Sequence, residues 1–365
     1  MKHTIFFRVF KSLIIPLIFL TLMITSFVAI YHWNQSLVTG FKITLYYIIV
    51  LIAGVIFNLI TALLKEERPK AIKIFFTILS GVLFLPVFIF GFSLSLFCLI
   101  HKRFNRYGPY VIAFCASVAT LSMGVFVFGF GNIKNYKKTK RKISGLNHLS
   151  SYDYINVGLV GSYTNWLVMV GKNLWKWKPF RPFFDLVAVP IYREDENVEL
   201  RTGAVHKSIS FFNQKVANLI LFFEGSRSRD KRFLSFKLGG FLIAKRANVP
   251  IFPVVIVGSD KIRKPGPQDI KSYKNGFDLE DIDLGKLIKD LIKLIFTEGI
   301  NPGVVINYYM DPIYPDGKEI SDLREETKSK MEAVYTKIDK MKLPAIQLFL
   351  EDLRIFIDNL LGKVR

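Results

Sequence analysis

The pattern of apolar and polar positions divides the chain into a mostly apolar first third and a more polar, basic remainder. Four long apolar runs come first, over roughly residues 13–31, 43–64, 74–100 and 110–130. A helix needs about 20 apolar residues to cross the hydrocarbon core of a bilayer. Since each run is near or above that length, we expect residues 1–135 to form a membrane anchor with about four transmembrane helices.

Basic residues between the runs indicate the topology of this anchor. Three precede the first run, one lies between the first and second, four lie between the second and third, and six follow the fourth; the loop between the third and fourth runs has three, more than an outside loop should have. The positive-inside rule then places the N-terminus and everything after the fourth run in the cytoplasm. The basic cluster over residues 135–142 acts as a topology signal, and a sharper interpretation is that it also attracts anionic lipid head groups.

From residue 143 onward, short apolar segments alternate with amphipathic ones. Near-continuous apolar strands that alternate with helices are typical of an α/β sheet covered on both faces. We therefore expect an α/β domain with a central, mostly parallel sheet over residues 136–343. The expected strands are 143–147, 186–192, 218–223, 251–257 and 304–309, and the expected helices are one from near Ser150 that carries Trp166, then 203–214, 236–247, 284–296 and 320–341.

The last stretch of the chain, residues 344–365, is unusually apolar and is expected to form a helix of its own. Packing against the α/β domain is one explanation of this composition. Lying on the bilayer surface is the alternative, since amphipathic helices bind membrane interfaces through their apolar face.

Composition narrows the classes of partner. The formal net charge is +21, and 51% of the residues are hydrophobic. A basic surplus beside long apolar runs indicates anionic lipid more than nucleic acid, and the sequence has no aromatic-basic nucleic-acid module, so no nucleic-acid partner is expected. Cys98 and Cys115 both lie inside apolar runs, which argues against a disulfide framework or a cysteine metal site. We expect no bound metal.

The segment Asn147 to Asp153 contains the first candidate for chemistry. A neutral imidazole such as that of His148 can accept a proton at cytoplasmic pH, and a carboxylate on its other ring nitrogen fixes the tautomer and stabilises the imidazolium. His148 and Asp153 form this pair if the histidine sits on the turn and the aspartate in the first helical turn. A purely structural interpretation stays open, because Ser150 and Asp153 have the spacing of a helix N-cap and its acidic partner.

A second candidate region follows the apolar strand 218–223. Glu224, Gly225, Ser226 and Arg227 lie at its carboxyl end, where open α/β sheets place ligands, and arginine forks suit phosphate. The alternative is a solvated basic loop. Two more cations are placed similarly: Arg193 at the end of strand 186–192, and Lys237 before a Gly-Gly pair that opens a helix, where phosphate binding and tight packing are both possible.

These pieces, in this order, resemble the glycerolipid acyltransferase family, which includes the 1-acylglycerol-3-phosphate acyltransferases. The first family block, Asn-His-x4-Asp, is matched at Asn147, His148 and Asp153, and the second ends in an arginine, matched at Arg193. The third, Phe-Pro-Glu-Gly-Thr-Arg-Ser, is matched over residues 222–228. The fourth is an apolar strand around a proline, matched by Pro250 and Pro253, and residues 170–174 look like the lysine-bearing stretch between the first two blocks.

The chain departs from the family pattern at several points. Phe223 stands where the family has proline, and Ser226 stands where it has threonine. Serine keeps the hydroxyl, whereas phenylalanine changes the shape of the loop and bears on the choice of acceptor. The first two apolar runs are additional to the one or two membrane helices of many relatives, and this bears on the identity of the lipid.

The resemblance implies direct acyl transfer by an integral membrane enzyme with its catalytic domain on the cytoplasmic side. His148, polarised by Asp153, would take the proton from a glycerol hydroxyl that attacks the thioester of acyl-CoA or acyl-carrier protein, with no cofactor. Substrate binding would fall to Asn147, Glu224, Gly225, Ser226, Arg227, Arg193 and Lys237.

The implied acceptor is lysophosphatidic acid and the product phosphatidic acid, a step of phospholipid biosynthesis. The alternatives are another lysophospholipid or glycerol-3-phosphate as acceptor, or a catalytically inactive lipid-binding protein on the same fold.

Overall fold

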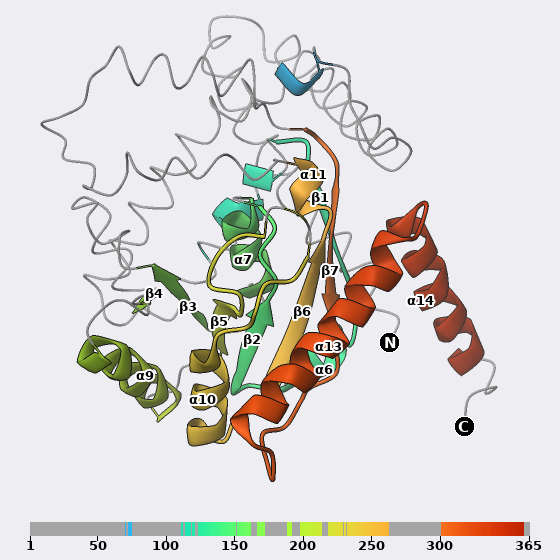
Figure 1. Ribbon diagram of the computed structural model, residues 1–365. Helices are drawn as coiled ribbons and strands as arrows, with labels where there is room; N and C mark the ends of the chain where they lie inside the picture. Colours follow the sequence, from blue (N-terminus) through green and yellow to red (C-terminus); the bar gives the residue numbers. More distant parts are fainter. Residues whose placement is uncertain are drawn as a thin grey trace, which may run out of the picture.

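The computed structural model describes residues 70, 72–74, 111, 114–117, 119–120, 123–150, 152–161, 166–171, 188–191, 198–213, 218–228, 230, 232–262 and 301–360. Within these ranges the chain forms a sheet with helices on both faces (Figure 1). The first two apolar runs, and the third apart from residue 74, lie outside the described residues, as does the helix expected over 284–296. A search of the described part found no helix with the length and apolarity that a membrane crossing requires.

The described strands make one seven-stranded sheet with the order β1-β7-β6-β2-β5-β3-β4. From β6 to β4 all neighbours are parallel. β7 is antiparallel to β6, and β1 pairs in parallel with β7. The strand bounds are Phe126–Gly131 (β1), Lys142–Leu146 (β2), Trp166–Gly171 (β3), Ala188–Ile191 (β4), Asn218–Phe222 (β5), Ile251–Val257 (β6) and Val304–Tyr309 (β7).

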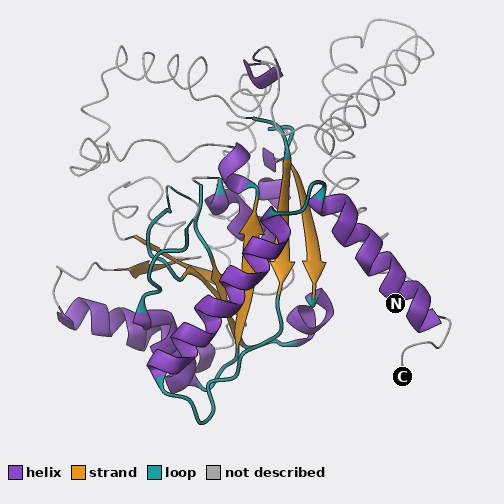
Figure 2. Ribbon diagram, turned by 45° about the vertical axis from the view of Figure 1, so that its right-hand side comes forward, coloured by secondary structure: helices purple, strands orange, loops and turns teal. Residues whose placement is uncertain are grey.

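Helices cover both faces of this sheet. Three helices, α9 (Val198–Asn213), α10 (Leu238–Ala247) and α13 (Ile320–Asp339), share one apolar core with one face of the strands. The helices α6 (Ile133–Lys138) and α7 (Asp153–Gly161) pack on the other face. Figure 1 shows α13 running diagonally across β6, and Figure 2 shows the strands between helices.

Two further helices belong to the described fold. The one-turn helix α11 (Ser259–Ile262) follows β6 directly, and α14 (Pro344–Leu360) follows α13 after a short turn. Ala345 and Leu348 of α14 are buried, and α14 contacts β1. The packing explanation of the apolar C-terminal stretch therefore holds for the first turns of this helix, while Leu350 is exposed.

The central strands are apolar on both faces, and many of their residues are β-branched. All seven residues of β6 are buried, as expected for a parallel strand covered on both sides. β6 and β7 have the bounds that the sequence pattern predicts, and the sheet is mostly parallel as expected. The helix before β6 ends at Asn248, whose left-handed backbone (φ 47°) lets its N–H donate to the carbonyls of Ala244 and Lys245 in a common C-cap arrangement.

Three sequence-based assignments differ from the structure. The fourth apolar run does not continue as one helix, because Phe126–Gly131 forms β1 at the edge of the sheet. The basic cluster is not only a juxtamembrane signal, because its first residues lie in α6 and Lys142 begins β2. Trp166 lies in β3 and not in the preceding helix, which ends at Gly161.

Candidate active site

Parallel pairing brings the two main candidate segments together. Leu146, the last residue of β2, is in register with Phe222, the last residue of β5. Each strand then continues into a loop at the same edge of the sheet, His148 on one and Glu224 on the other. The carboxyl ends of neighbouring parallel strands are the usual ligand site of α/β sheets.

The histidine and the aspartate form the predicted pair. Nδ1 of His148 lies 2.8 Å from Oδ2 of Asp153, and both side chains are almost completely buried. Asp153 is the first residue of α7, so the imidazole sits on the turn and the carboxylate in the first helical turn. With the Nδ1–H group donating a hydrogen bond to the carboxylate, the other ring nitrogen, Nε2, is the one able to accept a proton from a substrate.

The same carboxylate oxygen also accepts two backbone hydrogen bonds. The N–H groups of Leu149 and Ser150 each donate to Oδ2 of Asp153 at 2.8 Å. The Ser150 hydroxyl in turn accepts from the N–H of Tyr152 at 3.2 Å. Asp153 therefore orders the whole turn that carries the histidine.

The loop after β5 holds the histidine backbone from both sides. The N–H of His148 donates to Oε1 of Glu224 at 2.9 Å, and the carbonyl of His148 accepts from the N–H of Ser228 at 2.8 Å. The other oxygen of Glu224 accepts from the N–H of Leu234 at 2.9 Å. With both oxygens engaged and the residue 1% exposed, Glu224 positions His148 and leaves little surface for the substrate contact that the resemblance implied.

Burial dominates the electrostatics of Glu224. Desolvation raises the pKa of this carboxyl to about 7, although the N–H groups of Leu234 and His148 lower it; the Asp153 charge raises it further and that of Lys328 lowers it. A carboxyl group buried beside another carboxylate is expected to hold its proton more tightly. The Glu224 side chain therefore titrates near neutral pH, directly behind the histidine.

Asn147 is likewise a positioning residue in this structure. Its side-chain amide donates to the carbonyl of Ile256 at 2.9 Å and accepts from the N–H of Ile256 at 2.7 Å. The residue is fully buried. Asn147 ties the end of β2 to the end of β6, and this differs from the substrate contact implied by the resemblance.

Aromatic rings surround the imidazole. Phe222 stacks on His148 with the ring centroids 4.0 Å apart, and Tyr154 meets the same imidazole edge-on at 5.2 Å. Tyr154 is not among the residues that the sequence motifs indicate. Its position directly after Asp153, at the start of a helix, was the available signal.

The remaining predicted residues form the exposed side of the site. Gly225, Ser226 and Lys237 are exposed, and Arg227 is half-buried. Gly225 has a positive φ of 67°, and its Cα faces the side chain of Lys237, whose own N–H donates to the carbonyl of Phe223 at 2.7 Å. The structure thus brings Lys237 to the loop of Glu224, whereas Arg193 lies outside the described residues.

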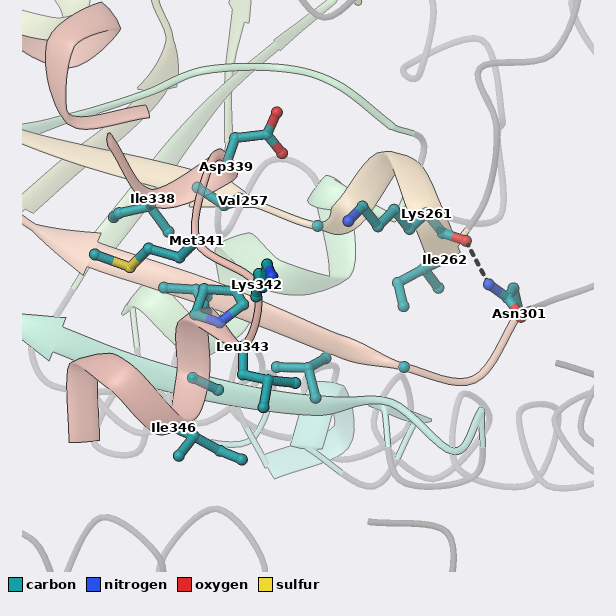
Figure 3. Close-up of a pocket in the computed structure, with 16 residues that line it drawn as sticks. Val257, Lys261, Ile262, Asn301, Ile338, Asp339, Met341, Lys342, Leu343 and Ile346 are labelled. Atoms are coloured by element: carbon teal, nitrogen blue, oxygen red, sulfur yellow. Dashed lines mark hydrogen bonds between the residues drawn. The ribbon is translucent and has the colours of Figure 1, made fainter. Parts of the chain in front are cut away.

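A separate hollow of about 100 Å³ lies at the same edge of the sheet, beyond the end of β6 (Figure 3). Its walls come from α11, the start of β7 and the turn between α13 and α14. Figure 3 shows the side-chain amide of Asn301 donating to the carbonyl of Lys261, which are 3.0 Å apart. None of the predicted site residues lines this hollow.

The segment that carries the His-Asp pair and the Glu224 loop can be compared with known families. Residues 128–257 match the family model described as Acyltransferase. This segment is an acyltransferase domain. The family resemblance expected from the motifs is therefore confirmed, and the matched span runs from within β1 to the end of β6.

Curated relatives of the acyltransferase domain have consistent names. A 1-acyl-sn-glycerol-3-phosphate acyltransferase of Haemophilus influenzae is 28% identical over 166 residues, which is 46% of this chain and 62% of that protein. The enzyme of the same name from Escherichia coli is 29% identical over 110 residues, 30% of this chain and 44% of that protein. The chain thus spans less than two thirds of the length of these relatives.

A solved structure shares the fold. The crystal structure of the 1-acyl-sn-glycerophosphate acyltransferase PlsC from Thermotoga maritima superposes with a TM-score of 0.53 and 19% identity, covering 74% of this chain and 97% of that chain. This similarity confirms the expected α/β fold with a mostly parallel central sheet.

Proposed function

We propose that the chain is a membrane-associated acyltransferase that moves a fatty acyl group from a thioester donor to the free hydroxyl of lysophosphatidic acid, giving phosphatidic acid. The observation that carries the proposal is the buried His148–Asp153 pair, 2.8 Å apart, fixed at the carboxyl edge of the sheet beside Arg227. The names of the curated relatives support the choice of acceptor.

The proposed reaction begins with a proton transfer to Nε2 of His148. The acceptor hydroxyl loses its proton to the imidazole as its oxygen attacks the thioester carbonyl, and Asp153 stabilises the imidazolium that forms. The new C–O ester bond forms, the C–S bond breaks, and the thiolate of CoA or acyl-carrier protein takes the proton back from the imidazolium. The balance is complete without a metal or a cofactor.

The exposed cations of the site fit the phosphate of the acceptor. Arg227 lies on the loop that clamps His148, and Lys237 lies beside Gly225 of the same loop. A guanidinium fork and an ammonium group bind phosphate by charge-assisted hydrogen bonds. We propose these two side chains, with Arg193, as the phosphate contacts. Ser226 and Gly225 lie within the same exposed loop.

The proposed enzyme is an integral membrane protein whose catalytic domain faces the cytoplasm. The apolar runs and the distribution of basic residues support this location. Its partners would be membrane lipids and the acyl donor, acyl-CoA or acyl-carrier protein.

The test is acyl transfer by the detergent-purified full chain, with lysophosphatidic acid and both donors. We expect His148→Ala to lower kcat by about 10²- to 10⁴-fold, the usual contribution of a general base. His206→Ala is the matched control, because His206 is an exposed histidine on α9 and its loss should leave kcat unchanged.

The acceptor is decided in the same assay. Lysophosphatidic acid should outperform lysophosphatidylcholine, lysophosphatidylethanolamine and glycerol-3-phosphate in kcat/KM. Preference for another member of this panel would replace the acceptor and keep the chemistry. No transfer to any acceptor by folded wild-type protein would overturn the enzyme proposal in favour of a lipid-binding role.

A further inference from the structure

The imidazole of His148 is covered to an unusual degree for a group that must reach a substrate. The residue is 3% exposed, although it lies in a loop at the open edge of the sheet. Its ring is stacked on Phe222 on one side and is met by the edge of Tyr154 on another. Of these two aromatic residues Phe222 is buried, whereas Tyr154 is 52% exposed. Of the two described rings that contact the imidazole, Tyr154 is therefore the one that also faces solvent.

Tyr154 makes a second ring contact in this position. Its ring also meets the ring of Phe222 edge-on, with the centroids 5.8 Å apart and an interplanar angle of 83°. Edge-to-face aromatic pairs contribute roughly 0.5–1.5 kcal/mol beyond the area that they bury. The residue lies in the first turn of α7, next to Asp153. Two ring contacts and its place at the start of α7 favour the position of Tyr154 against the histidine.

The charge of Arg227, one of the proposed phosphate contacts, acts on Tyr154. The charge of the Arg227 guanidinium lowers the pKa of the Tyr154 phenol, while burial, the largest cause, raises it, and so does the charge of Asp153. The net direction is upward, so the phenol stays neutral at physiological pH. Tyr154 thus lies within the electrostatic reach of Arg227 while its ring packs edge-on against His148.

We propose that Tyr154 is a positioning residue that shields His148 from water, so that the activated oxygen is that of a lipid acceptor. This inference rests on the proposed acyl transfer and deepens it. A water molecule that reaches Nε2 would lose its proton to the imidazole and attack the thioester, giving a free fatty acid and a thiol instead of a new ester. Excluding water from an active site prevents such side reactions.

The first test measures shielding without any substrate. Diethyl pyrocarbonate acylates accessible imidazoles, and peptide mass spectrometry resolves His148 from the other histidines of the full chain in detergent. We expect Tyr154→Ala to raise the rate of His148 modification, and Tyr154→Phe to keep the wild-type rate because the ring remains. Tyr314→Ala is the matched control, since Tyr314 is 54% exposed and follows Ile313, which pairs with the opposite end of β6.

The second test measures the partition between transfer and hydrolysis. Free fatty acid and phosphatidic acid are quantified from labelled acyl-CoA in the presence of lysophosphatidic acid. We expect Tyr154→Ala to raise the ratio of hydrolysis to transfer severalfold, because water then reaches Nε2 of His148. Tyr154→Phe and Tyr314→Ala should keep the wild-type ratio.

The outcomes separate this inference from the proposed function. If wild-type protein transfers no acyl group, the proposed function fails, and the modification rates alone decide whether Tyr154 shields His148. If wild type is active but Tyr154→Ala changes neither His148 modification nor the hydrolysis ratio, the inference is wrong and the function stands. Faster modification with an unchanged ratio also overturns the inference, because the cover would then have no chemical consequence.

Discussion

Asp153 shows how one side chain satisfies two interpretations of the same motif. Its Oδ2 accepts from Nδ1 of His148, as a catalytic pair requires, and from the N–H of Ser150, as a capping partner does. The sequence left these interpretations as alternatives, and the geometry combines them. The spacing predicted the contact correctly because all the partners lie within one turn of the chain.

Two substitutions at Asp153 should separate the two roles. Asp153→Asn keeps an acceptor for the backbone N–H groups, so we expect near-wild-type thermal stability but a fall in kcat of about 10²- to 10⁴-fold. Asp153→Ala should lose the cap as well, at a further cost of about 1 kcal/mol. Thermal unfolding and acyl transfer, measured on the same samples, check both. Equal stability of the two variants would contradict the capping role.

Glu224 should make the stability of the domain depend on pH. Its folded pKa is raised from 4.5 to about 7, so between these values the folded state holds a proton that the unfolded state has released. The protonated Glu224 therefore makes its whole contribution to the free energy of unfolding below about pH 4.5, and this contribution is lost as the pH rises through about 7. The total loss is at most about 3 kcal/mol. We expect Glu224→Gln to lose less stability than wild type between pH 5 and pH 8, as measured by thermal unfolding in one detergent.

At the scale of the element, core packing accounts for the phenylalanine at position 223, where the family motif has proline. The phenylalanine that replaces proline is fully buried and stacks on Phe241 and Phe236 at 4.6 and 5.1 Å. A Cβ on Gly145 of β2 would come within 1.7 Å of this ring. The side chain thus belongs to the core beneath α10. Its expected effect on the acceptor stays a prediction without a direct contact to support it.

Gly145 and Phe223 should therefore be coupled energetically. We expect Gly145→Ala to destabilise the protein by at least about 1–3 kcal/mol through overpacking. The loss should be partly recovered in the double variant Gly145→Ala, Phe223→Leu. A double-mutant cycle of unfolding free energies measures the coupling, and strictly additive effects would contradict the contact.

Elements were predictable where their apolar pattern has only one explanation. The strands 251–257 and 304–309 have the predicted bounds. Both are short runs rich in β-branched and aromatic residues, and such runs between turn residues favour a buried strand over a helix. β1 was missed because Phe126–Gly131 continues an apolar run of helical length. The contact of Glu224 with the His148 backbone was also beyond prediction, because it depends on β2 and β5 being neighbours in space.

At the scale of the whole molecule, the sheet begins earlier than the predicted boundary at residue 135. β1 covers the outer edge of β7, and Phe126 and Phe130 are buried. A chain truncated to residues 136–365 lacks this strand and exposes an unpaired apolar edge, which promotes aggregation. We expect it to aggregate in size-exclusion chromatography where residues 123–365, in the same detergent, elute as a discrete species. Equal elution profiles would show that β1 is dispensable.

The reversed direction of β1 and β7 has a consequence for kinetics. β1 runs parallel to β7 and antiparallel to β6, so Phe126 enters the sheet at the edge that carries His148. In the proposed membrane enzyme, the membrane anchor expected before Phe126 and the reacting groups would then share one side of the domain, and turnover would be confined to two dimensions. Its rate should follow the mole fraction of lysophosphatidic acid in the bilayer, and should fall when inert phospholipid dilutes that surface at constant bulk concentration.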